Sequence, residues 1–114
     1  MPLTWSSTIE ERAVNYPAAH PTKRPPTHPG ALLDELIENV GKSKTEIARL
    51  LGISRQHLYD IIGEKKPVSP EVAVRLGKLF GGGAGAWVRM QGAYDTWHAE
   101  QAVDVSEIPT LTAA

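Results

Sequence analysis

The sequence predicts an all-α fold: a compact domain of five helices with a flexible N-terminal arm. Two observations lead to this prediction. Apolar residues recur every three to four positions through five successive segments, and no segment has the strong alternation of a β-strand. With 114 residues, 41% of them hydrophobic, the chain can bury one modest core. We therefore expect a single domain over residues 29–100, built from helices joined by short connections.

Residues 1–28 are expected to form an extended or partly disordered arm, because the stretch HPTKRPPTHP prevents any long regular element. A short helical piece over residues 7–15 is compatible with this arm. Its larger apolar side chains are unusual for a disordered segment and could either pack back on the domain or bind a partner. These residues are Trp5, Ile9, Val14 and Tyr16.

The first two helices have recognisable ends. Pro29 suits a first helical position and Gly41 a helix end. Ser43 and Glu46 form the spacing of a capping box, and Gly52 ends the segment that follows. The expected buried positions are Leu32, Leu33, Leu36, Ile37 and Val40 in the first helix, and Ile47, Ala48, Leu50 and Leu51 in the second.

The remaining three helices are delimited in the same way. Ser54 caps a third helix at about residues 54–63, and Ser69-Pro70-Glu71 opens a fourth. The glycine-rich run of residues 81–85 precedes a fifth helix at about residues 86–100, and residues 101–114 form a C-terminal tail in which VDVSEI is a short strand or irregular. The apolar positions are Leu58, Ile61 and Ile62 in the third helix, Val72, Ala73, Leu76, Leu79 and Phe80 in the fourth, and Trp87, Met90, Tyr94 and Trp97 in the fifth.

The second and third helices have the spacing of a helix-turn-helix, which presents its second helix to the major groove of DNA. Residues 42–66 carry six basic and three acidic side chains, whereas the segments on either side each carry three basic and five acidic ones. The net charge of −1 therefore conceals one basic segment. A charge run by itself often marks only a solvated face, and its coincidence with the helix-turn-helix favours a DNA contact.

Arg55 and Gln56 are the leading candidates for base contacts, because they lie in the first turn of the recognition helix, outside its apolar stripe. Arginine can bind guanine O6 and N7, and glutamine adenine N6 and N7. His57 could contact a base or a phosphate, and Asp60 could accept from cytosine N4 or repel phosphate. The alternative is that all are ordinary solvated residues. The predicted DNA-binding set is Lys44, Thr45, Arg55, Gln56, His57, Tyr59, Lys65 and Lys66.

Catalysis is not expected from this chain. Its four histidines are scattered, it has no cysteine, and it lacks phosphate-binding and nucleophile motifs, so we expect neither metal nor cofactor. No apolar run approaches the roughly 20 residues of a membrane span, which predicts no membrane partner. The absence of cysteine and of a signal peptide predicts a cytoplasmic protein.

The aromatic face of the fifth helix has two interpretations. Trp87, Met90, Tyr94 and Trp97 could belong to the core, or they could form the seam of a homodimer, since aromatic and methionine side chains are enriched in interfaces. We favour the homodimer, because a small domain has little room for these side chains. Two recognition helices related by a two-fold axis would then read a palindrome with half-sites about 34 Å apart.

Three segments resemble the HigA antitoxins, a branch of the Xre-type (lambda-repressor-like) helix-turn-helix proteins. They are HPGALLDELIE, KTEIARLLGISRQHLYDIIGEKKPVSPEVAVRLGKLFG and WVRMQGAYDTWHAE, and the match covers roughly residues 28–100. The most specific parts are HPG, S-P-E-x-A-x-R-L and W-x-x-x-Q-x-x-Y-D-x-W. One departure is Gly63-Glu64, where relatives usually have Asn-Gly after the recognition helix.

This resemblance implies a dimeric antitoxin that represses its own operon at a palindromic operator DNA. It also implies neutralisation of a RelE-like (HigB-type) toxin, which cleaves mRNA. The resemblance places groove-reading residues at Arg55, Gln56 and His57, and DNA-backbone contacts at Lys44, Lys65 and Lys66. The alternatives are a stand-alone Xre-family repressor without a toxin, or a binding module without DNA function. The apolar residues of the arm are the candidates for toxin contact.

Overall fold

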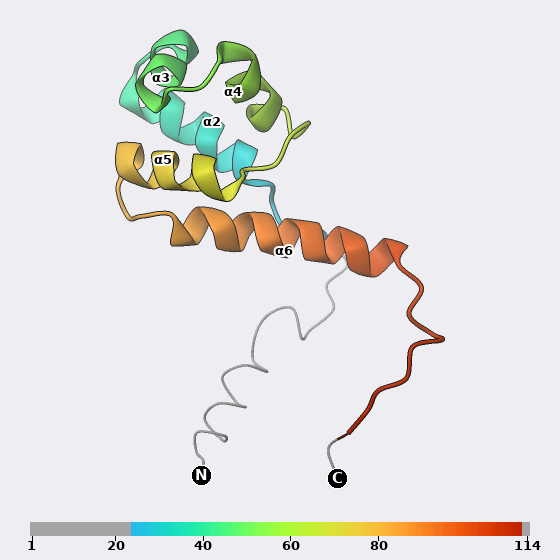
Figure 1. The fold of residues 1–114 in the computed structure, drawn as a ribbon. Coiled ribbons are helices and arrows are strands. Elements are labelled where there is room, and N and C mark those ends of the chain that lie inside the picture. Colours follow the sequence, from blue (N-terminus) through green and yellow to red (C-terminus); the bar gives the residue numbers. More distant parts are fainter. Residues whose placement is uncertain (1–23, 113–114) are drawn as a thin grey trace, which may run out of the picture. The chain divides into compact units, whose positions relative to one another are not determined.

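The computed structural model describes residues 24–112, and this part of the chain is all-α (Figure 1). Its helices are α2 (Pro29–Val40), α3 (Lys44–Leu51), α4 (Arg55–Ile62), α5 (Pro70–Phe80) and α6 (Gly85–Ala102). The predicted fold class and the five expected helices are confirmed. Residues 1–23 and 113–114 lie outside the described range. The arm residues predicted to contact a toxin fall in this undescribed part: Trp5, Ile9, Val14 and Tyr16.

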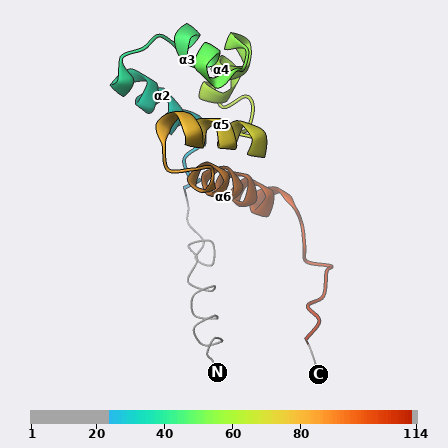
Figure 2. The same ribbon diagram turned by 60° about the vertical axis from the view of Figure 1, so that its left-hand side comes forward.

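The chain divides into two compact units, each of which is considered by itself. Among the described residues, the larger unit comprises 26–96, with α2 to α5 and the first part of α6, and the smaller comprises 24–25 and 97–112. In the larger unit α4 packs against α2 and α3, and α5 packs against α3 (Figures 1 and 2). In the smaller unit residues 103–112 form neither helix nor strand, so VDVSEI does not form the short strand that its alternation left open.

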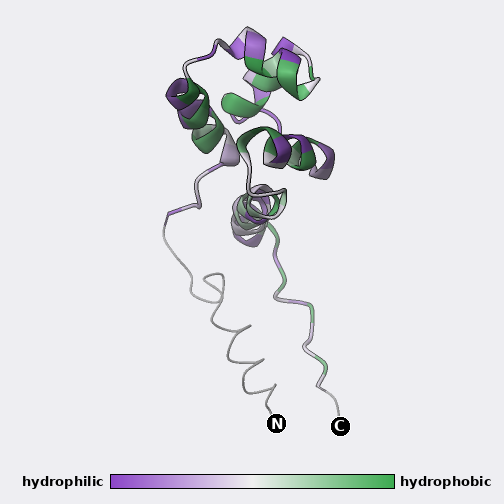
Figure 3. Cartoon of the chain, turned by 90° about the vertical axis from the view of Figure 1, so that its left-hand side faces the viewer, coloured by the Kyte–Doolittle hydropathy of each residue, from purple (hydrophilic) through white to green (hydrophobic). Residues whose placement is uncertain are grey.

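The core of the larger unit contains apolar side chains from every helix, and the hydrophilic residues of α2 to α5 lie mainly on the outer sides (Figure 3). Two positions expected in the buried stripes are exposed instead: Val40 is 49% exposed and Leu50 43% exposed. Val40 is the last residue of α2, and Leu50 directly precedes the last residue of α3, Leu51, which is buried at 3% exposure in its place. The most deeply buried large side chains include Leu33, Ile47, Leu58, Ile61 and Leu76.

The helix ends follow the local signals of the sequence. The hydroxyl groups of Ser43, Ser54 and Ser69 each accept a backbone N–H from three residues ahead, at 3.1, 3.0 and 3.2 Å. These bonds satisfy donors that the first turn of a helix leaves unpaired. Gly41 and Gly52 end α2 and α3 in the left-handed conformation, with φ of 74° and 75°.

The His-Pro-Gly sequence at the start of α2 attaches this helix to the end of α4. His28 is 3% exposed, and its Nδ1 accepts the N–H of Gly30 at 2.9 Å, so histidine serves as the N-cap. A Cβ atom at Gly30 would lie 2.1 Å from the carbonyl oxygen of Ile61. Only glycine allows the two backbones to approach this closely. The position of α4 therefore depends on this contact.

Candidate nucleic-acid interface

Helix α4 is anchored on one side and presents the other to solvent. Leu58 and Ile61 are fully buried, whereas Arg55 and Gln56 in the first turn are exposed. Tyr59 is 46% exposed. A helix held in this way can offer its early polar residues to a groove without rearranging its core.

Two of the predicted DNA-binding residues contact each other across the helix-turn-helix. The Nη1 atom of Arg55 lies 3.4 Å from the hydroxyl oxygen of Thr45, which it approaches as a donor. This long contact joins the first turns of α3 and α4. His57 is partly buried, and so presents less surface than its neighbour Gln56.

The carboxylate of Asp60 contacts two of the predicted DNA-binding residues, Gln56 and Lys66. Its Oδ1 accepts from the Gln56 amide Nε2 at 2.9 Å, and its Oδ2 lies 3.8 Å from the ammonium nitrogen of Lys66. Its backbone carbonyl accepts the N–H groups of Lys65 and Lys66 at 2.8 and 3.1 Å. The Asp60 side chain is only 15% exposed. Neither role considered for Asp60 from the sequence includes these internal bonds, although glutamine and aspartate four residues apart are a recognised helical pair.

The predicted phosphate contacts lie at the edges of the motif. Lys44 pairs with Asp34 at 3.6 Å, and Lys66 with Asp60 at 3.8 Å, while Lys65 is exposed on the turn after α4. The Lys44–Asp34 pair is partly exposed, and such pairs contribute about 0–1 kcal/mol, so a phosphate can replace Asp34 at little cost. Lys66 is the exposed partner of its own pair, at 57%, although Asp60 is only 15% exposed. The lysines can thus turn to DNA while α3 and α4 keep their positions.

Arg49 is also basic and exposed, but its guanidinium is held by Glu46 on the same helix. This hydrogen bond is the main reason that the pKa of Glu46 is lowered and the pKa of Arg49 is raised. Because the Glu46 carboxylate binds Arg49, the capping box expected with Ser43 is only half formed.

The framework around the motif depends on buried or partly buried polar bonds that the sequence analysis did not identify. Arg75 of α5 donates to the carbonyl oxygen of Leu51 at 2.8 Å, which fixes the end of α3. Gln91 of α6 is 6% exposed, and its Oε1 accepts the N–H of Val68 at 2.8 Å. Its Nε2 donates to Asp95 at 2.9 Å. The bond between Val68 and Gln91 therefore holds the loop that follows α4, and the Arg75 bond holds the end of α3.

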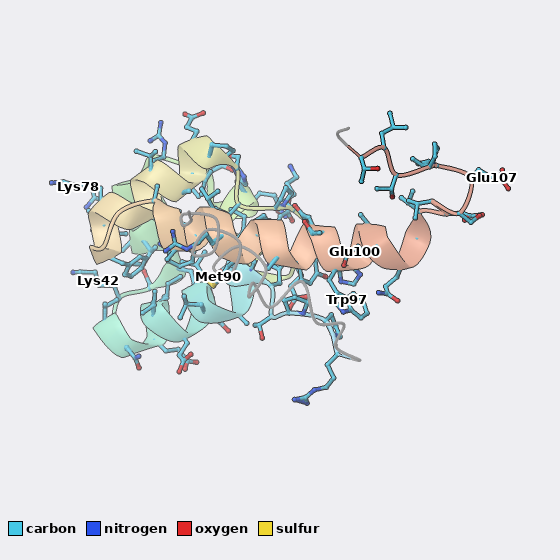
Figure 4. The ribbon with its side chains drawn as sticks, turned by 90° about the horizontal axis from the view of Figure 1, so that it is seen from below. Lys42, Lys78, Met90, Trp97, Glu100 and Glu107 are labelled. Carbon is cyan, nitrogen blue, oxygen red and sulfur yellow. The ribbon has the colours of Figure 1, made fainter. Side chains whose placement is uncertain are left out.

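The four residues predicted for a homodimer seam on α6 differ in how deeply they are buried in their own chain, and the seam itself stays a prediction. Trp87 is 4% exposed and packs near Phe80, with ring centroids 6.5 Å apart, so it belongs to the core of its own chain. Tyr94 lies edge-to-face with His28 at 4.8 Å, and Met90 packs against the core on the side of α6 facing α2 (Figure 4). The domain thus has room for Trp87 in its core, whereas the other three predicted residues are only partly buried.

In the smaller unit Trp97 is partly buried and stacks edge-to-face on His98, with centroids 5.0 Å apart. The tail that follows α6 carries Glu107 (Figure 4) and exposed apolar side chains. These apolar residues are Val103, Val105, Ile108 and Leu111.

A shallow hollow of about 200 Å³ lies beside the turn after α4, between His28, Lys66 and Gln91. Its two buried polar residues, His28 and Gln91, already bond to the protein. Within residues 24–112, no three histidine or acidic side chains are grouped as metal ligands would be. None of the helices in that range has the length and apolar character needed to cross a membrane.

Comparison with known proteins identifies the family. A helix-turn-helix family model matches residues 33–85. Virulence-associated protein I of Dichelobacter nodosus is 37% identical over 78 residues, which cover 68% of this chain and 72% of that protein. The Escherichia coli HTH-type transcriptional regulator YbaQ is 33% identical over 85 residues, covering 74% and 75% of the two chains.

A similar solved structure is the antitoxin HigA of Pseudomonas aeruginosa, determined with the higBA promoter. It is 35% identical, covers 68% of this chain and 85% of its own, and superposes with a TM-score of 0.64. At this identity and coverage the likeness extends beyond the fold to the family. The chain therefore belongs to the helix-turn-helix family, in the branch of the HigA-type antitoxins.

Proposed function

We propose that this protein is a cytoplasmic antitoxin that binds a palindromic operator DNA as a homodimer and represses its own operon. The observation that carries the proposal is the exposed first turn of α4, where Arg55 and Gln56 stand between basic residues of α3 and of the following turn. The relative from Pseudomonas aeruginosa, an antitoxin solved with promoter DNA, supports it.

The proposed contacts divide by chemistry. Arg55 donates two hydrogen bonds to a guanine, and Gln56 reads an adenine. His57 and Tyr59 add a base or phosphate contact beside them. Thr45 and the three lysines Lys44, Lys65 and Lys66 contact phosphates, which strengthens binding without selecting a sequence.

Binding to the promoter region upstream of the gene, measured at fixed salt, tests the DNA-binding part. Arg55→Ala should cost about 1–3 kcal/mol and relax the preference at one base pair. Arg89→Ala, which removes an exposed arginine from α6, is the matched control and should leave that preference intact. If both variants bind like the unchanged protein at every base pair, the assignment of α4 as the recognition helix is wrong.

The homodimer requires a separate measurement. The structure leaves Trp87 in the core, so of the side chains predicted for the seam we retain Met90, Tyr94 and Trp97. Sedimentation velocity over a concentration series should detect a dimer, and Trp97→Ala should weaken it. A chain that remains monomeric at the concentrations that saturate its operator would contradict the two-fold arrangement.

We further propose that the antitoxin binds and neutralises a RelE-like (HigB-type) toxin that cleaves mRNA. Trp5, Ile9, Val14 and Tyr16 are the candidate contacts, and all four lie outside the described residues. Co-expression with the adjacent reading frame should yield a stable complex and relieve growth arrest. If no adjacent frame encodes a small toxin of this type, the toxin-binding part fails.

The second candidate is a stand-alone Xre-family repressor without a toxin partner. The similarity to YbaQ, described as a transcriptional regulator, favours it. Both candidates predict operator binding, so DNA assays cannot separate them. The co-expression experiment does, because only the antitoxin acquires a partner and restores growth.

A further inference from the structure

We propose that Asp60 determines which base Gln56 reads, by fixing the side-chain amide in the orientation that matches adenine and rejects guanine. This inference rests on the proposed operator binding. It assigns Asp60 as a positioning residue that acts through Gln56 and does not itself contact DNA.

The location of the Asp60 carboxylate supports a positioning role. The side chain is 15% exposed, and its two oxygens face Gln56 and Lys66. Its backbone carbonyl is held by two N–H groups of the following turn, so the carbonyl end of this residue is also fixed. Little of the carboxylate remains to accept a hydrogen bond from cytosine or to repel a phosphate.

The chemistry of the contact fixes the amide. A carboxylate only accepts hydrogen bonds, so the atom of Gln56 that faces Asp60 at 2.9 Å must be the nitrogen Nε2. One of the two amide hydrogens is then used inside the protein. Gln56 has one donor and one acceptor left for the major groove.

This remaining pattern distinguishes the two purines. Adenine presents an acceptor at N7 and a donor at N6, which match one donor and one acceptor. Guanine presents two acceptors, N7 and O6, and would require both amide hydrogens. A glutamine without the Asp60 contact could turn its amide to serve either base. Asp60 thus restricts Gln56, which could otherwise bind either purine, to adenine.

The contact also prepares Gln56 for binding, because the side chain is already ordered in the free protein and loses less rotamer freedom on the DNA. Lys66 shares the same carboxylate, and it can leave for a phosphate while the bond to Gln56 persists. Loss of Asp60 should therefore change base preference more than overall affinity.

The test compares variants on duplexes of the promoter upstream of the gene, with each base pair of the bound site varied in turn. The unchanged protein should prefer adenine over guanine at one position by about tenfold or more, and Gln56→Ala should remove this preference. Asp60→Ala should reduce it to about threefold or less. Asp60→Asn should do the same, because an asparagine amide can face Gln56 with either its oxygen or its nitrogen.

Two controls separate positioning from charge. Asp34→Ala removes a carboxylate paired with Lys44 and leaves Gln56 untouched, so it should raise affinity for all sequences and keep the adenine preference. When Gln56 is already replaced by alanine, adding Asp60→Ala should cause no further change in base preference, because Asp60 acts only through Gln56. In NMR spectra of the free protein, one side-chain NH₂ signal of Gln56 should be shifted from the position typical of a solvent-exposed glutamine, and Asp60→Ala should return it to that position.

An adenine preference that survives in both Asp60 variants would overturn the inference and leave the proposed operator binding intact. Gln56 side-chain NH₂ shifts in the unchanged protein equal to those of a solvent-exposed glutamine would also overturn the inference, and this measurement needs no variant to fold. If the unchanged protein prefers no base at any position, the proposed sequence-specific function fails, and this inference fails with it.

Discussion

Replacing Gly30 by alanine tests the contact on which the position of α4 depends. The new Cβ would lie 2.1 Å from the carbonyl oxygen of Ile61 and 3.1 Å from Nδ1 of His28. The obstructing oxygen belongs to the backbone, so α2 and α4 must move apart. Forcing an extra carbon into a close-packed site costs about 1–3 kcal/mol, and a backbone obstacle places this case near 3. Alanine recovers at most about 1 kcal/mol through its better helix propensity.

The expected net loss is therefore about 2 kcal/mol in the free energy of unfolding, measured by urea denaturation followed by circular dichroism. The midpoint of thermal unfolding should fall by roughly 8 °C or more. Operator affinity should also fall at temperatures where the variant is fully folded, because α4 is displaced.

Gly92→Ala is the matched control for this substitution. Gly92 lies within α6, and a Cβ there would meet nothing within 4 Å. The same chemical change should stabilise the protein by about 0.5–1 kcal/mol, since only helix propensity acts. Equal effects of the two substitutions, or an unchanged stability in Gly30→Ala, would refute the argument that the α2 and α4 backbones are in direct contact.

Further substitutions probe the rest of the framework. Gly77→Ala should lower the free energy of unfolding by about 1–3 kcal/mol, because its Cβ would lie 2.2 Å from the backbone of Gly83. An unchanged midpoint of urea denaturation would contradict this. Gln91→Ala should cost about 1–3 kcal/mol by leaving the buried N–H of Val68 unpaired, which hydrogen exchange at Val68 reports. Glu64→Asn should stabilise the protein by up to about 1 kcal/mol, because Glu64 has a φ of 63° that asparagine tolerates better. A melting temperature that does not rise would contradict this. That change should also tighten operator binding in a titration, because it removes a negative charge beside Lys65 and Lys66.

The helices and their ends were predictable because their signals are local. A serine before a helix and a glycine after it act within one turn, and Ser43, Ser54 and Ser69 all form the expected caps. The capping box shows where this reasoning ends. Glu46 has two competing partners within reach, and the ionic one, Arg49, prevails over the backbone N–H.

Sequence spacing could not predict whether the aromatic residues of α6 are buried in their own chain. A stripe at helical period looks the same whether it faces the chain's own core or a second copy. Trp87 is buried in the core of its own chain, and Phe80, seven residues earlier and across a glycine-rich loop, lies beside it. The bond between Gln91 and Val68 spans 23 residues and has no local signal. The bond between Gln56 and Asp60, by contrast, has a local signal, because the two residues are four positions apart in one helix.

The three most specific parts of the family resemblance, HPG, S-P-E-x-A-x-R-L and W-x-x-x-Q-x-x-Y-D-x-W, share a structural role. HPG caps α2 and allows it to pack closely on α4. S-P-E-x-A-x-R-L caps α5 and holds the end of α3 through Arg75. In the third part, Gln91 holds the loop after α4. All three fix the position of the motif, and none contributes a proposed base contact. A framework of this kind tolerates changes in the exposed first turn of α4 at little cost in stability, since surface substitutions usually alter it by less than about 0.5 kcal/mol. Operator preference can therefore change through Arg55, Gln56 and the residue that orients Gln56, while the fold stays the same.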